Sequence, residues 1–512
     1  MPGSVGRKGR ISIFNKWHRM RHDDNYLWAS LEEKYGLTKS EFIALLEKHL
    51  GFPPTGGQMY LFQKLTEHLS MPGNEKVFVV RGYAGTGKTS IVRAVVRTLK
   101  ETSLKTVLLA PTGRAAKVLS AYAGKQAFTI HKKIYFAQSG DFGMQFSMQK
   151  NKHKNTVFIV DEASMIGASQ DEEQHNLLSD LIEYVQSGEA CRLMLIGDSA
   201  QLPPVGCDES PALDPKFLST EFFLQVDECR LTEVMRQRLE SGILFNATEI
   251  RNQIDQSTET IPRLSTQLFP DVMKIQGTDL EDALQSAYTE FGDEEVLVVT
   301  RSNKSANLFN RQIRARIKWQ DNMISAGDHI MIVKNNYFWL PENSGPGFIA
   351  NGDTMEILRI KKQEEKGEFL FADAEVRMID YPDEPEIEVK LMLNALDIEQ
   401  ASMPYLKMKE LRKIIEEDYA HLKSKQQRYK AMKKDPFLNA LQIKFAYAVT
   451  CHKAQGGQWK CVFIDQGYVT EETLDRNYLR WLYTAVTRAT LKVCFVNFHK
   501  NFYHEKEREE YS

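Results

Sequence analysis

Short apolar runs alternate with amphipathic helical segments along the first half of the chain. The runs cover residues 77–80, 106–110, 157–160 and 193–196. Each run is bounded by turn residues, and helical segments such as 90–99 and 177–184 lie between the runs. Short buried strands that alternate with helices are typical of a parallel sheet with helices on both faces. The pattern therefore predicts an α/β domain.

The same alternation returns nearer the C-terminus, where it predicts a second α/β domain. Its strands and helices are expected at residues 296–300, 304–317, 462–464, 479–486 and 492–496. Residues 328–445 interrupt this domain with a different pattern, in which β-like segments separated by Gly, Asn and Asp precede a long polar helix at 407–434. We interpret this region as a small β-barrel that carries a helical projection.

These patterns divide the chain into four predicted parts. The parts are an N-terminal extension at 1–45, a first α/β domain at 46–230, a second α/β domain at 231–327 and 446–512, and the insertion at 328–445 with its helical tower at about 400–435. A small hairpin insertion is expected in the first domain at about 130–155. The basic N-terminal segment lacks the apolar core of a secretory signal; we interpret it as an unstructured or weakly docked tail, with a transit peptide as the alternative.

The composition is that of an ordinary globular protein. Of the 512 residues, 42% are hydrophobic and 26% are charged. No apolar run reaches the roughly 20 residues that span a bilayer. The six cysteines are dispersed without a C-x-x-C pair, which argues against a zinc site, an iron–sulfur cluster or a disulfide framework and favours a reducing, cytoplasmic compartment. The formal net charge of −2 leaves nucleic-acid binding open, because a groove needs only local positive charge.

A phosphate-binding loop follows the first apolar run. Residues 82–89, Gly-Tyr-Ala-Gly-Thr-Gly-Lys-Thr, fit the pattern G-x-x-x-x-G-K-[ST] and lead directly into a predicted helix. The glycines of such a loop allow backbone N–H groups to wrap phosphates at the positive end of the helix. Lys88 is expected to contact the β- and γ-phosphates, and the Thr89 hydroxyl is expected to bind Mg²⁺. The expected nucleotide contacts in this motif are Gly82, Gly85, Thr86, Gly87, Lys88, Thr89 and Ser90.

Two carboxylates end the apolar run at 157–160. Asp161 is expected to hold Mg²⁺, directly or through water, and Glu162 to orient and deprotonate the attacking water. Acidic residues at the end of a strand are often merely solvated, but after a phosphate-binding loop they become strong evidence. The two motifs together predict hydrolysis of a nucleoside triphosphate.

Six further segments of distinctive sequence follow in a fixed order. They are LAPTGRAA at 109–116, TIH at 129–131, GDSAQLPPV at 197–205, LTEVMRQ at 231–237, TCHKAQG at 450–456 and YTAVTRA at 483–489. The ordered set resembles the motifs of superfamily 1B helicases, in the RecD-like and phage Dda-like branch, from about Gln58 to the C-terminal end. The resemblance implies two RecA-like P-loop domains, a small hairpin insertion in the first, and an SH3-like β-barrel with a helical insertion in the second.

The resemblance also implies roles around the nucleotide. Gln58 would read the adenine edge, and Gln201 would couple the γ-phosphate to DNA. Arg236 and Arg488 would reach the γ-phosphate from the second α/β domain and stabilise charge on the transferred phosphoryl group. Gln455 and Gly456 are the remaining expected nucleotide contacts. The predicted catalytic residues are Glu162, Lys88, Gln201, Arg236 and Arg488, the cofactors ATP and Mg²⁺, and the metal ligands Thr89 and Asp161.

A second set of residues is expected to form a track for single-stranded DNA. It comprises Thr112, Thr129, His131, Thr450, His452 and Lys453. Short hydroxyl, imidazole and ammonium donors suit phosphate contacts, although each of these side chains could instead cap a helix or hold a turn. Residues 135–144 lie where the family carries a separation pin, whose aromatic tip, such as Phe142, would stack on a base pair or else pack on its own domain.

We interpret the chain as an ATP-dependent DNA helicase that moves along single-stranded DNA, and branch membership implies 5′-to-3′ movement. The expected partners are single-stranded DNA, single-strand/duplex junctions and replication or repair proteins, with no membrane and a monomeric state. Two alternatives are a RecD-like motor subunit of a nuclease complex and a non-motor, DNA-responsive P-loop ATPase. The paired arginines argue against the second alternative, because a pure binder needs no such sensors.

Overall fold

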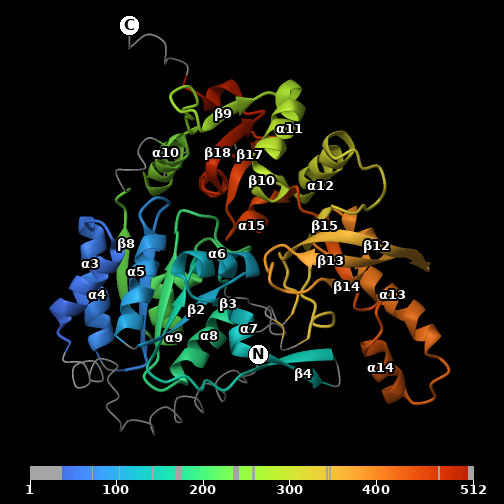
Figure 1. Cartoon of the computed structure of the whole chain (residues 1–512), viewed down its shortest axis with the longest axis horizontal. Coiled ribbons are helices and arrows are strands. Elements are labelled where there is room, and N and C mark those ends of the chain that lie inside the picture. The colour runs from blue at the N-terminus through green and yellow to red at the C-terminus, as the bar shows by residue number, and fades with distance from the viewer. Residues whose placement is uncertain are drawn as a thin grey trace, which may run out of the picture.

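The computed structural model describes residues 37–504 except 72, 103, 141–142, 168–175, 235–240, 257–259, 342–343, 345–347 and 471–472. This part of the chain contains two parallel sheets, a closed barrel and a two-stranded hairpin (Figure 1). The predicted fold class is therefore confirmed. Among the described residues, no helix is long and apolar enough to cross a membrane.

The first sheet has the strand order β3-β2-β6-β7-β1-β8, with parallel pairing throughout. Its strands are β1 (Lys76–Gly82), β2 (Lys105–Ala110), β3 (Ala127–Thr129), β6 (Thr156–Val160), β7 (Arg192–Gly197) and β8 (Gln225–Leu231). The helices of this domain are α3 (Lys39–Leu50), α4 (Gly56–Ser70), α5 (Lys88–Glu101), α6 (Gly113–Ala123), α7 (Ile130–Ile134), α8 (Leu177–Gln186) and α9 (Pro215–Phe222). Because β1 lies between β7 and β8, the loops that follow these strands share one edge.

Side-chain alternation along β1 gives this sheet a core on each face. Phe78 and Val80 pack with helices α3 to α6, whereas Val77 and Val79 pack with α7 and α8. Helix α3 spans the predicted boundary between residues 45 and 46. Its buried side chains on both sides of that boundary pack into the first core, so the helix belongs with this domain.

The second sheet has the order β16-β10-β17-β18-β9. Its strands are β9 (Val272–Ile275), β10 (Val296–Thr300), β16 (Ala448–Thr450), β17 (Trp459–Asp465) and β18 (Ala489–Val496). Its helices are α10 (Gly242–Gln256), α11 (Leu280–Phe291), α12 (Asn303–Gln312), α15 (Cys451–Ala454) and α16 (Arg476–Val486). The chain leaves this sheet after α12 and returns at β16, which is the split that the sequence predicts.

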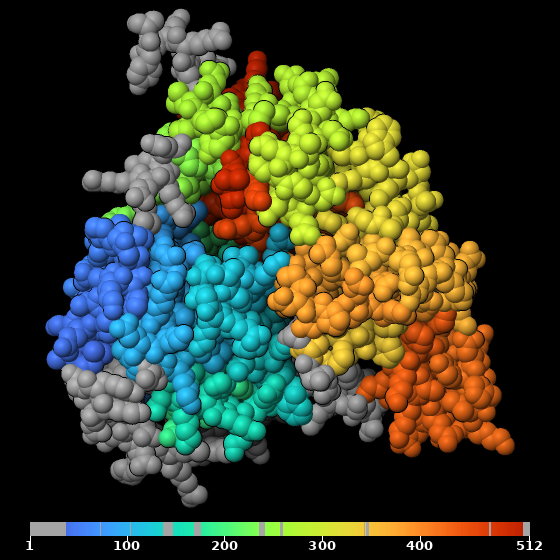
Figure 2. Space-filling view, viewed as in Figure 1, coloured from blue at the N-terminus to red at the C-terminus, as the bar shows by residue number. Residues whose placement is uncertain are grey.

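The segment between the halves of the second domain closes into a five-stranded barrel. Its strands are β11 (His329–Ile332), β12 (Thr354–Lys366), β13 (Phe369–Met378), β14 (Ile387–Met392) and β15 (Leu441–Phe445). The barrel lies against the first domain (Figure 2), where the Lys117 ammonium donates to the carbonyl oxygen of Ile379 at 2.8 Å. The hairpin β4 (Tyr135–Gly140) and β5 (Gly143–Met148) projects from the first domain on the barrel side (Figure 1).

The helix predicted over 407–434 is wrong, because two helices occupy this region. Helix α13 (Tyr405–Asp418) and helix α14 (Lys425–Lys433) are joined by a turn. The Tyr419 hydroxyl donates to the Asp435 carboxylate at 2.9 Å, and the Tyr419 ring packs beside the cluster formed by Leu411 and Ile415 of α13 with the barrel. The turn keeps these apolar contacts on the barrel, and no Pro or Gly in residues 407–434 signals it.

Candidate ATP site and nucleic-acid track

The phosphate-binding loop joins β1 to α5 at the shared edge of the first sheet. Gly85 and Gly87 have φ angles of 79° and 87°, which glycine adopts without the steric cost that a side chain would impose. The Thr86 hydroxyl donates to the carbonyl oxygen of Tyr83 at 2.8 Å and closes the loop on itself. The backbone therefore has the curled form that a phosphate cradle requires.

The Lys88 side chain folds back over this loop. Its ammonium donates to the carbonyl oxygens of Gly82 at 2.5 Å and Tyr83 at 3.0 Å. It also lies 3.7 Å from the carboxylate of Asp198, a residue that is fully buried. A phosphate bound at the loop would compete with these acceptors for the same ammonium.

Asp161 and Glu162 follow β6 at the same edge. Asp161 Oδ1 accepts the backbone N–H of Glu162 at 2.9 Å, and Asp161 Oδ2 accepts the hydroxyl of Tyr122 from α6. Glu162 has a φ of 53°, a strained left-handed conformation of the kind that clusters at functional sites. Burial raises the pKa of Glu162 and Arg488 opposes that rise, so this carboxyl is a better proton acceptor than an ordinary one.

The residues predicted to hold Mg²⁺ supply two oxygen ligands, the Thr89 hydroxyl and the Asp161 carboxylate. Thr89 is exposed in the first turn of α5. Because Mg²⁺ commonly takes one or two protein ligands together with phosphate oxygens and water, this small set fits the ion. The described residues contain no group of three or more His, Cys, Asp or Glu that could hold a metal without such help.

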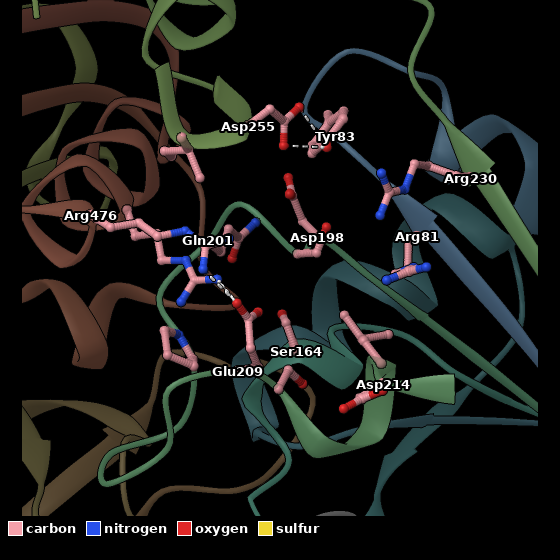
Figure 3. Close-up of a pocket in the computed structure, with 16 residues that line it drawn as sticks. Arg81, Tyr83, Ser164, Asp198, Gln201, Glu209, Asp214, Arg230, Asp255 and Arg476 are labelled. Atoms are coloured by element: carbon pink, nitrogen blue, oxygen red, sulfur yellow. Dashed lines mark hydrogen bonds and ion pairs between the residues drawn. The ribbon is translucent and has the colours of Figure 1, made fainter. Parts of the chain in front are cut away.

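A cavity of about 300 Å³ lies between the two domains beside this site. Asp198 and Gln201 of the first domain line it together with Asp255 of α10 and Arg476 of α16 (Figure 3). Gln201 is only 6% exposed, and its side-chain oxygen has no hydrogen-bond partner in the part of the chain that the structure describes. The predicted coupling residue thus lies at the domain interface with an unused acceptor.

Arg488 follows α16 and is 3% exposed. Its guanidinium donates to the carbonyl oxygens of Thr484 and Gly457, both at 3.1 Å, and to the Thr487 hydroxyl at 3.2 Å. Its charge is nevertheless felt by Glu162, whose pKa it lowers against the larger effect of burial. The charge of this buried arginine in the second domain therefore acts on the carboxylate of the first, and contact of Arg488 with a γ-phosphate stays a prediction.

Gln58 is fully buried at the start of α4. Its side-chain nitrogen donates to the carbonyl oxygen of Thr86 at 3.1 Å, and its side-chain oxygen accepts the backbone N–H of Thr55 at 3.1 Å. The amide therefore supports the phosphate-binding loop and caps its own helix. Reading of an adenine edge by Gln58 stays a prediction and would require exchange of these hydrogen bonds.

Gln455 and Gly456 lie between the two domains. The Gln455 amide donates to the carbonyl oxygen of Leu202 at 2.8 Å. A Cβ atom on Gly456 would stand 3.0 Å from Ala115 and 3.2 Å from the Thr112 hydroxyl oxygen. These contacts join the TCHKAQG segment to two motifs of the first domain, while direct nucleotide contact by either residue stays a prediction.

Two of the three threonines of the predicted DNA track, Thr112 and Thr129, cap helices of their own domain. The Thr112 hydroxyl accepts the backbone N–H of Ala115, and the Thr129 hydroxyl accepts that of Lys132, both at 3.2 Å. Thr450 precedes α15 without a side-chain cap bond. A capping threonine can still offer its O–H to a phosphate, so the structural and DNA roles are compatible.

The remaining track residues lie close to these caps. His131 is on α7 with its ring 5.7 Å from the ring of Tyr135, His452 is exposed on α15, and Lys453 donates to Asn351 of the barrel. Across the interface, the Arg114 guanidinium lies 4.0 Å from the centre of the Trp459 ring. Segments from both sheets thus meet on the barrel side of the molecule.

Two predicted residues, Arg236 and Phe142, lie outside the described residues. Within the hairpin, the Tyr135 hydroxyl donates to Asp180 at 2.6 Å and its ring is 6% exposed, so it packs on its own domain. Phe136 is 41% exposed and is the better placed of these two aromatics for a separation pin.

Comparison with known proteins places the chain in a family. An AAA domain model matches residues 66–207, and a UvrD-like helicase C-terminal domain model matches residues 445–496. An ATP-dependent DNA helicase, dda of Enterobacteria phage T4, is 25% identical over 62% of this chain and 73% of its own. An ATP-dependent RecD2 DNA helicase of Deinococcus radiodurans is 30% identical over 36% of this chain and 27% of its own. The chain belongs to the superfamily 1 helicases. Its branch is that of RecD and Dda.

Two further similarities extend along most of this helicase. An uncharacterized protein of Acanthamoeba polyphaga mimivirus is 22% identical over 86% of this chain and 99% of its own. A crystal structure of Pif1 helicase from Bacteroides with ADP-AlF3 and ssDNA has 15% identity and a TM-score of 0.45, covering 89% of this chain and 95% of that one. The predicted family and enzyme class, an ATP-dependent DNA helicase, are confirmed by the domain models and the curated relatives.

The sequence did not reveal three polar residues of the helicase. Tyr122 bonds to Asp161 from a helix far away in sequence, and no pattern signals that contact. Asp198 and Tyr483 lie inside two of the motifs, yet their mutual hydrogen bond at 2.7 Å needs two domains in place. For Asp198 and Tyr483, their position inside a motif was the signal that the sequence offered.

Proposed function

We propose that this helicase hydrolyses ATP between its two parallel sheets and uses the resulting closure and opening to step 5′-to-3′ along single-stranded DNA and separate duplexes. One observation carries the proposal. The Tyr483 hydroxyl of α16 accepts the backbone N–H of Ala84 in the phosphate-binding loop, and the charge of Arg488, which follows α16, lowers the pKa of Glu162, so hydrolysis and domain approach would involve the same residues.

At the ATP site, the loop amides and Lys88 would bind the phosphates, and Thr89 and Asp161 would hold Mg²⁺, which supplies charge neutralisation for the phosphoryl oxygens. The Lys88 ammonium would leave the carbonyl oxygens of Gly82 and Tyr83 for the phosphate. Glu162 would accept the proton of the attacking water, since its raised pKa suits a general base. Arg488 would stabilise charge on the transferred group once the domains approach.

On the opposite side, Thr112 and Thr129 of the first domain and Thr450 and His452 of the second would hold the phosphates of one strand. A strand held by both domains moves when the domains approach and separate, because each domain grips it in turn. Backbone contacts carry no sequence information, so such a track suits a general translocase. Among the similar proteins, dda is an ATP-dependent DNA helicase and a Pif1 helicase was crystallised with ssDNA.

The test compares ATPase and unwinding on defined substrates. We expect single-stranded DNA to stimulate ATP hydrolysis, and a duplex with a 5′ single-stranded tail to be unwound in preference to one with a 3′ tail. Stimulated hydrolysis without unwinding of either substrate would support the DNA-responsive ATPase instead. Preference for the 3′ tail would contradict the polarity that the branch implies.

A further inference from the structure

One buried hydroxyl of the second domain touches two separate loops of the first. Tyr483 lies on α16 and is 1% exposed. Its hydroxyl donates to Asp198 Oδ2 at 2.7 Å and accepts the backbone N–H of Ala84 at 2.8 Å. Ala84 belongs to the phosphate-binding loop and Asp198 to the segment after β7. The contact with Ala84 is made to the backbone, so it fixes the course of the loop itself.

The neighbouring loop residue makes a second contact with the same domain. The Tyr83 hydroxyl donates to both carboxylate oxygens of Asp255 on α10, at 3.0 and 2.9 Å. The Arg251 guanidinium, also on α10, lies 4.6 Å from the centre of the Tyr83 ring. Figure 3 shows Tyr83 and Asp255 side by side above Asp198. Since α10 and α16 pack on each other, one block of the second domain holds two consecutive residues of the loop.

We propose that Tyr483 is a positioning residue for ATP hydrolysis. Its hydroxyl links the phosphate-binding loop and Asp198, by hydrogen bonds, to the helix that leads to Arg488. The tie sets where Arg488 stands relative to the bound phosphates, because both the loop and the arginine are then fixed to the same helix. Tyr83 and Asp255 add a second point of attachment and prevent rotation about the first. This inference rests on the proposed function, since it requires hydrolysis at this interface.

The charges around Asp198 indicate when the contact matters most. Asp198 is fully buried, and its carboxylate accepts the backbone N–H of Ala200 at 3.0 Å and the Tyr483 hydroxyl, with the Lys88 ammonium 3.7 Å away. When Lys88 turns to a phosphate, the hydroxyl and the amide are the partners that the carboxylate keeps among the described residues. Burial and the Asp198 charge raise the pKa of Tyr483 far above neutrality, so the hydroxyl stays protonated and continues to donate.

The experiment compares Tyr483→Phe with Tyr478→Phe in the full chain. Tyr478 lies on the same helix and is 2% exposed, and its contacts with the rings of Trp481 and Phe502 and with the Gln466 side chain lie within the second domain, so it is a matched control. We expect Tyr483→Phe to lower kcat for DNA-stimulated ATP hydrolysis about tenfold, as loss of a hydrogen bond to a charged group predicts, with the KM for ATP changed less than about twofold. The control should change neither value.

A double-mutant cycle separates positioning from general stability. If the hydroxyl acts through Asp198, then Tyr483→Phe should cost less than about threefold in kcat when Asp198→Asn is already present, because coupled residues are not additive. Thermal unfolding of each variant should show similar midpoints for Tyr483→Phe and Tyr478→Phe. A full tenfold cost in both backgrounds, or a fall in kcat matched by an equal fall for the control, would overturn the positioning role.

The inference and the proposed function fail in distinguishable ways. If the parent protein hydrolyses ATP with single-stranded DNA and Tyr483→Phe does so at the same kcat, the positioning role is wrong and the proposed function stands. If the parent protein shows no DNA-stimulated hydrolysis, the proposed function is wrong, and the inference falls with it.

Discussion

The proposed nucleotide side and the proposed DNA side of the domain interface are built in different ways. On the nucleotide side, buried side chains of the second domain bond directly to backbone atoms of the first. The Gln455 side-chain amide donates to the carbonyl oxygen of Leu202, and the Thr484 hydroxyl accepts the backbone N–H of Leu202, both at 2.8 Å. On the DNA side, Thr112 and Thr129 cap helices of their own domain, and His452 is exposed.

The difference teaches which property each side controls. Buried cross-domain hydrogen bonds fix distances to within a few tenths of an ångström, and catalysis depends steeply on such distances. Hydroxyl and imidazole groups that contact one phosphate at a time would hold a strand weakly, which would allow the strand to be released at every step. Substitutions on the nucleotide side should therefore change rates strongly, and those on the DNA side should change affinity modestly.

The largest effect is expected at Glu162. Replacing its carboxylate in Glu162→Gln removes the proton acceptor while keeping shape and polarity, so kcat for ATP hydrolysis should fall about a hundredfold or more. Binding of ATP should persist, as measured by fluorescence of a labelled nucleotide. Because burial raises the pKa of Glu162, the parent rate should fall as pH drops below that pKa, where the carboxyl is protonated. Near-parent turnover by Glu162→Gln would show that another group activates water.

A smaller loss of rate is expected at Tyr122, which donates to Asp161 Oδ2. Tyr122→Phe frees that oxygen and removes its orienting donor, so kcat should fall about tenfold and the Mg²⁺ concentration for half-maximal activity should rise. Tyr288→Phe is the control, because its buried hydroxyl lacks a hydrogen-bond partner among the described residues and lies in the second domain. An unchanged Mg²⁺ dependence would mean that Tyr122 only packs.

The contrast between the two sides also explains what the sequence could predict. The glycines, Lys88, Asp161 and Glu162 stand in short contiguous patterns whose chemistry fixes the backbone around them, so their placement followed from the motif. Strands β8 and β9 were not predicted, because β8 is an edge strand with mostly polar side chains and β9 has four residues. The turn between α13 and α14 was missed because a tertiary hydrogen bond, rather than Pro or Gly, stabilises it.

The hydrogen bonds between the two domains could not be predicted from the sequence. Tyr483 reaches Ala84 and Asp198 only when three remote segments have folded against one another. Gln58 gives a second example. The sequence predicts that it reads the adenine edge, and it could not predict that its side-chain amide also donates to the carbonyl oxygen of Thr86. A pattern identifies the residue type a site needs, whereas the partner of that residue depends on packing.

We expect strand separation to depend on the hairpin, with an effect smaller than that of substitutions at the ATP site and larger than that of substitutions on the DNA track. Phe136 is exposed on β4, and stacking of an aromatic on a base contributes about 1–3 kcal/mol. Phe136→Ala should therefore slow unwinding of a 5′-tailed duplex about fivefold while DNA-stimulated ATPase stays near the parent value. Tyr135→Phe is the comparison variant. It removes the hydroxyl bond to Asp180 at the base of the hairpin and keeps the exposed Phe136 ring, so it separates loosening of the hairpin from loss of stacking. Parallel losses of unwinding and ATPase in Phe136→Ala would assign the hairpin a structural role.

On the DNA track itself, truncation should weaken binding to a similar extent for every sequence. Thr450→Val and His452→Ala each remove one expected phosphate donor, and we expect about a threefold loss of affinity for single strands of different composition. Fluorescence anisotropy at fixed salt measures this directly. Thr470→Val is the control, because Thr470 lies in a loop of the second domain where its backbone N–H and carbonyl oxygen bond to the Thr473 hydroxyl, and the substitution keeps both backbone groups. A loss that depends on base sequence would contradict a backbone track.

The smallest expected effect is a dependence of DNA affinity on pH through Lys453. Desolvation lowers the pKa of this ammonium to about 8, and the charged form is the one that attracts a phosphate. Its contribution should be present at pH 7 and should be lost as pH rises through that pKa. A DNA phosphate beside the ammonium favours the charged form, so binding near pH 8 should take up part of a proton.

Lys453→Arg keeps its charge throughout this range. The affinity of the parent protein divided by that of Lys453→Arg should therefore fall about twofold between pH 7 and pH 9, which is the size expected of one partly exposed ionic contact. This ratio cancels every other group that titrates over the same interval. A flat ratio would place Lys453 away from the phosphates and leave its bond to Asn351 of the barrel as its role.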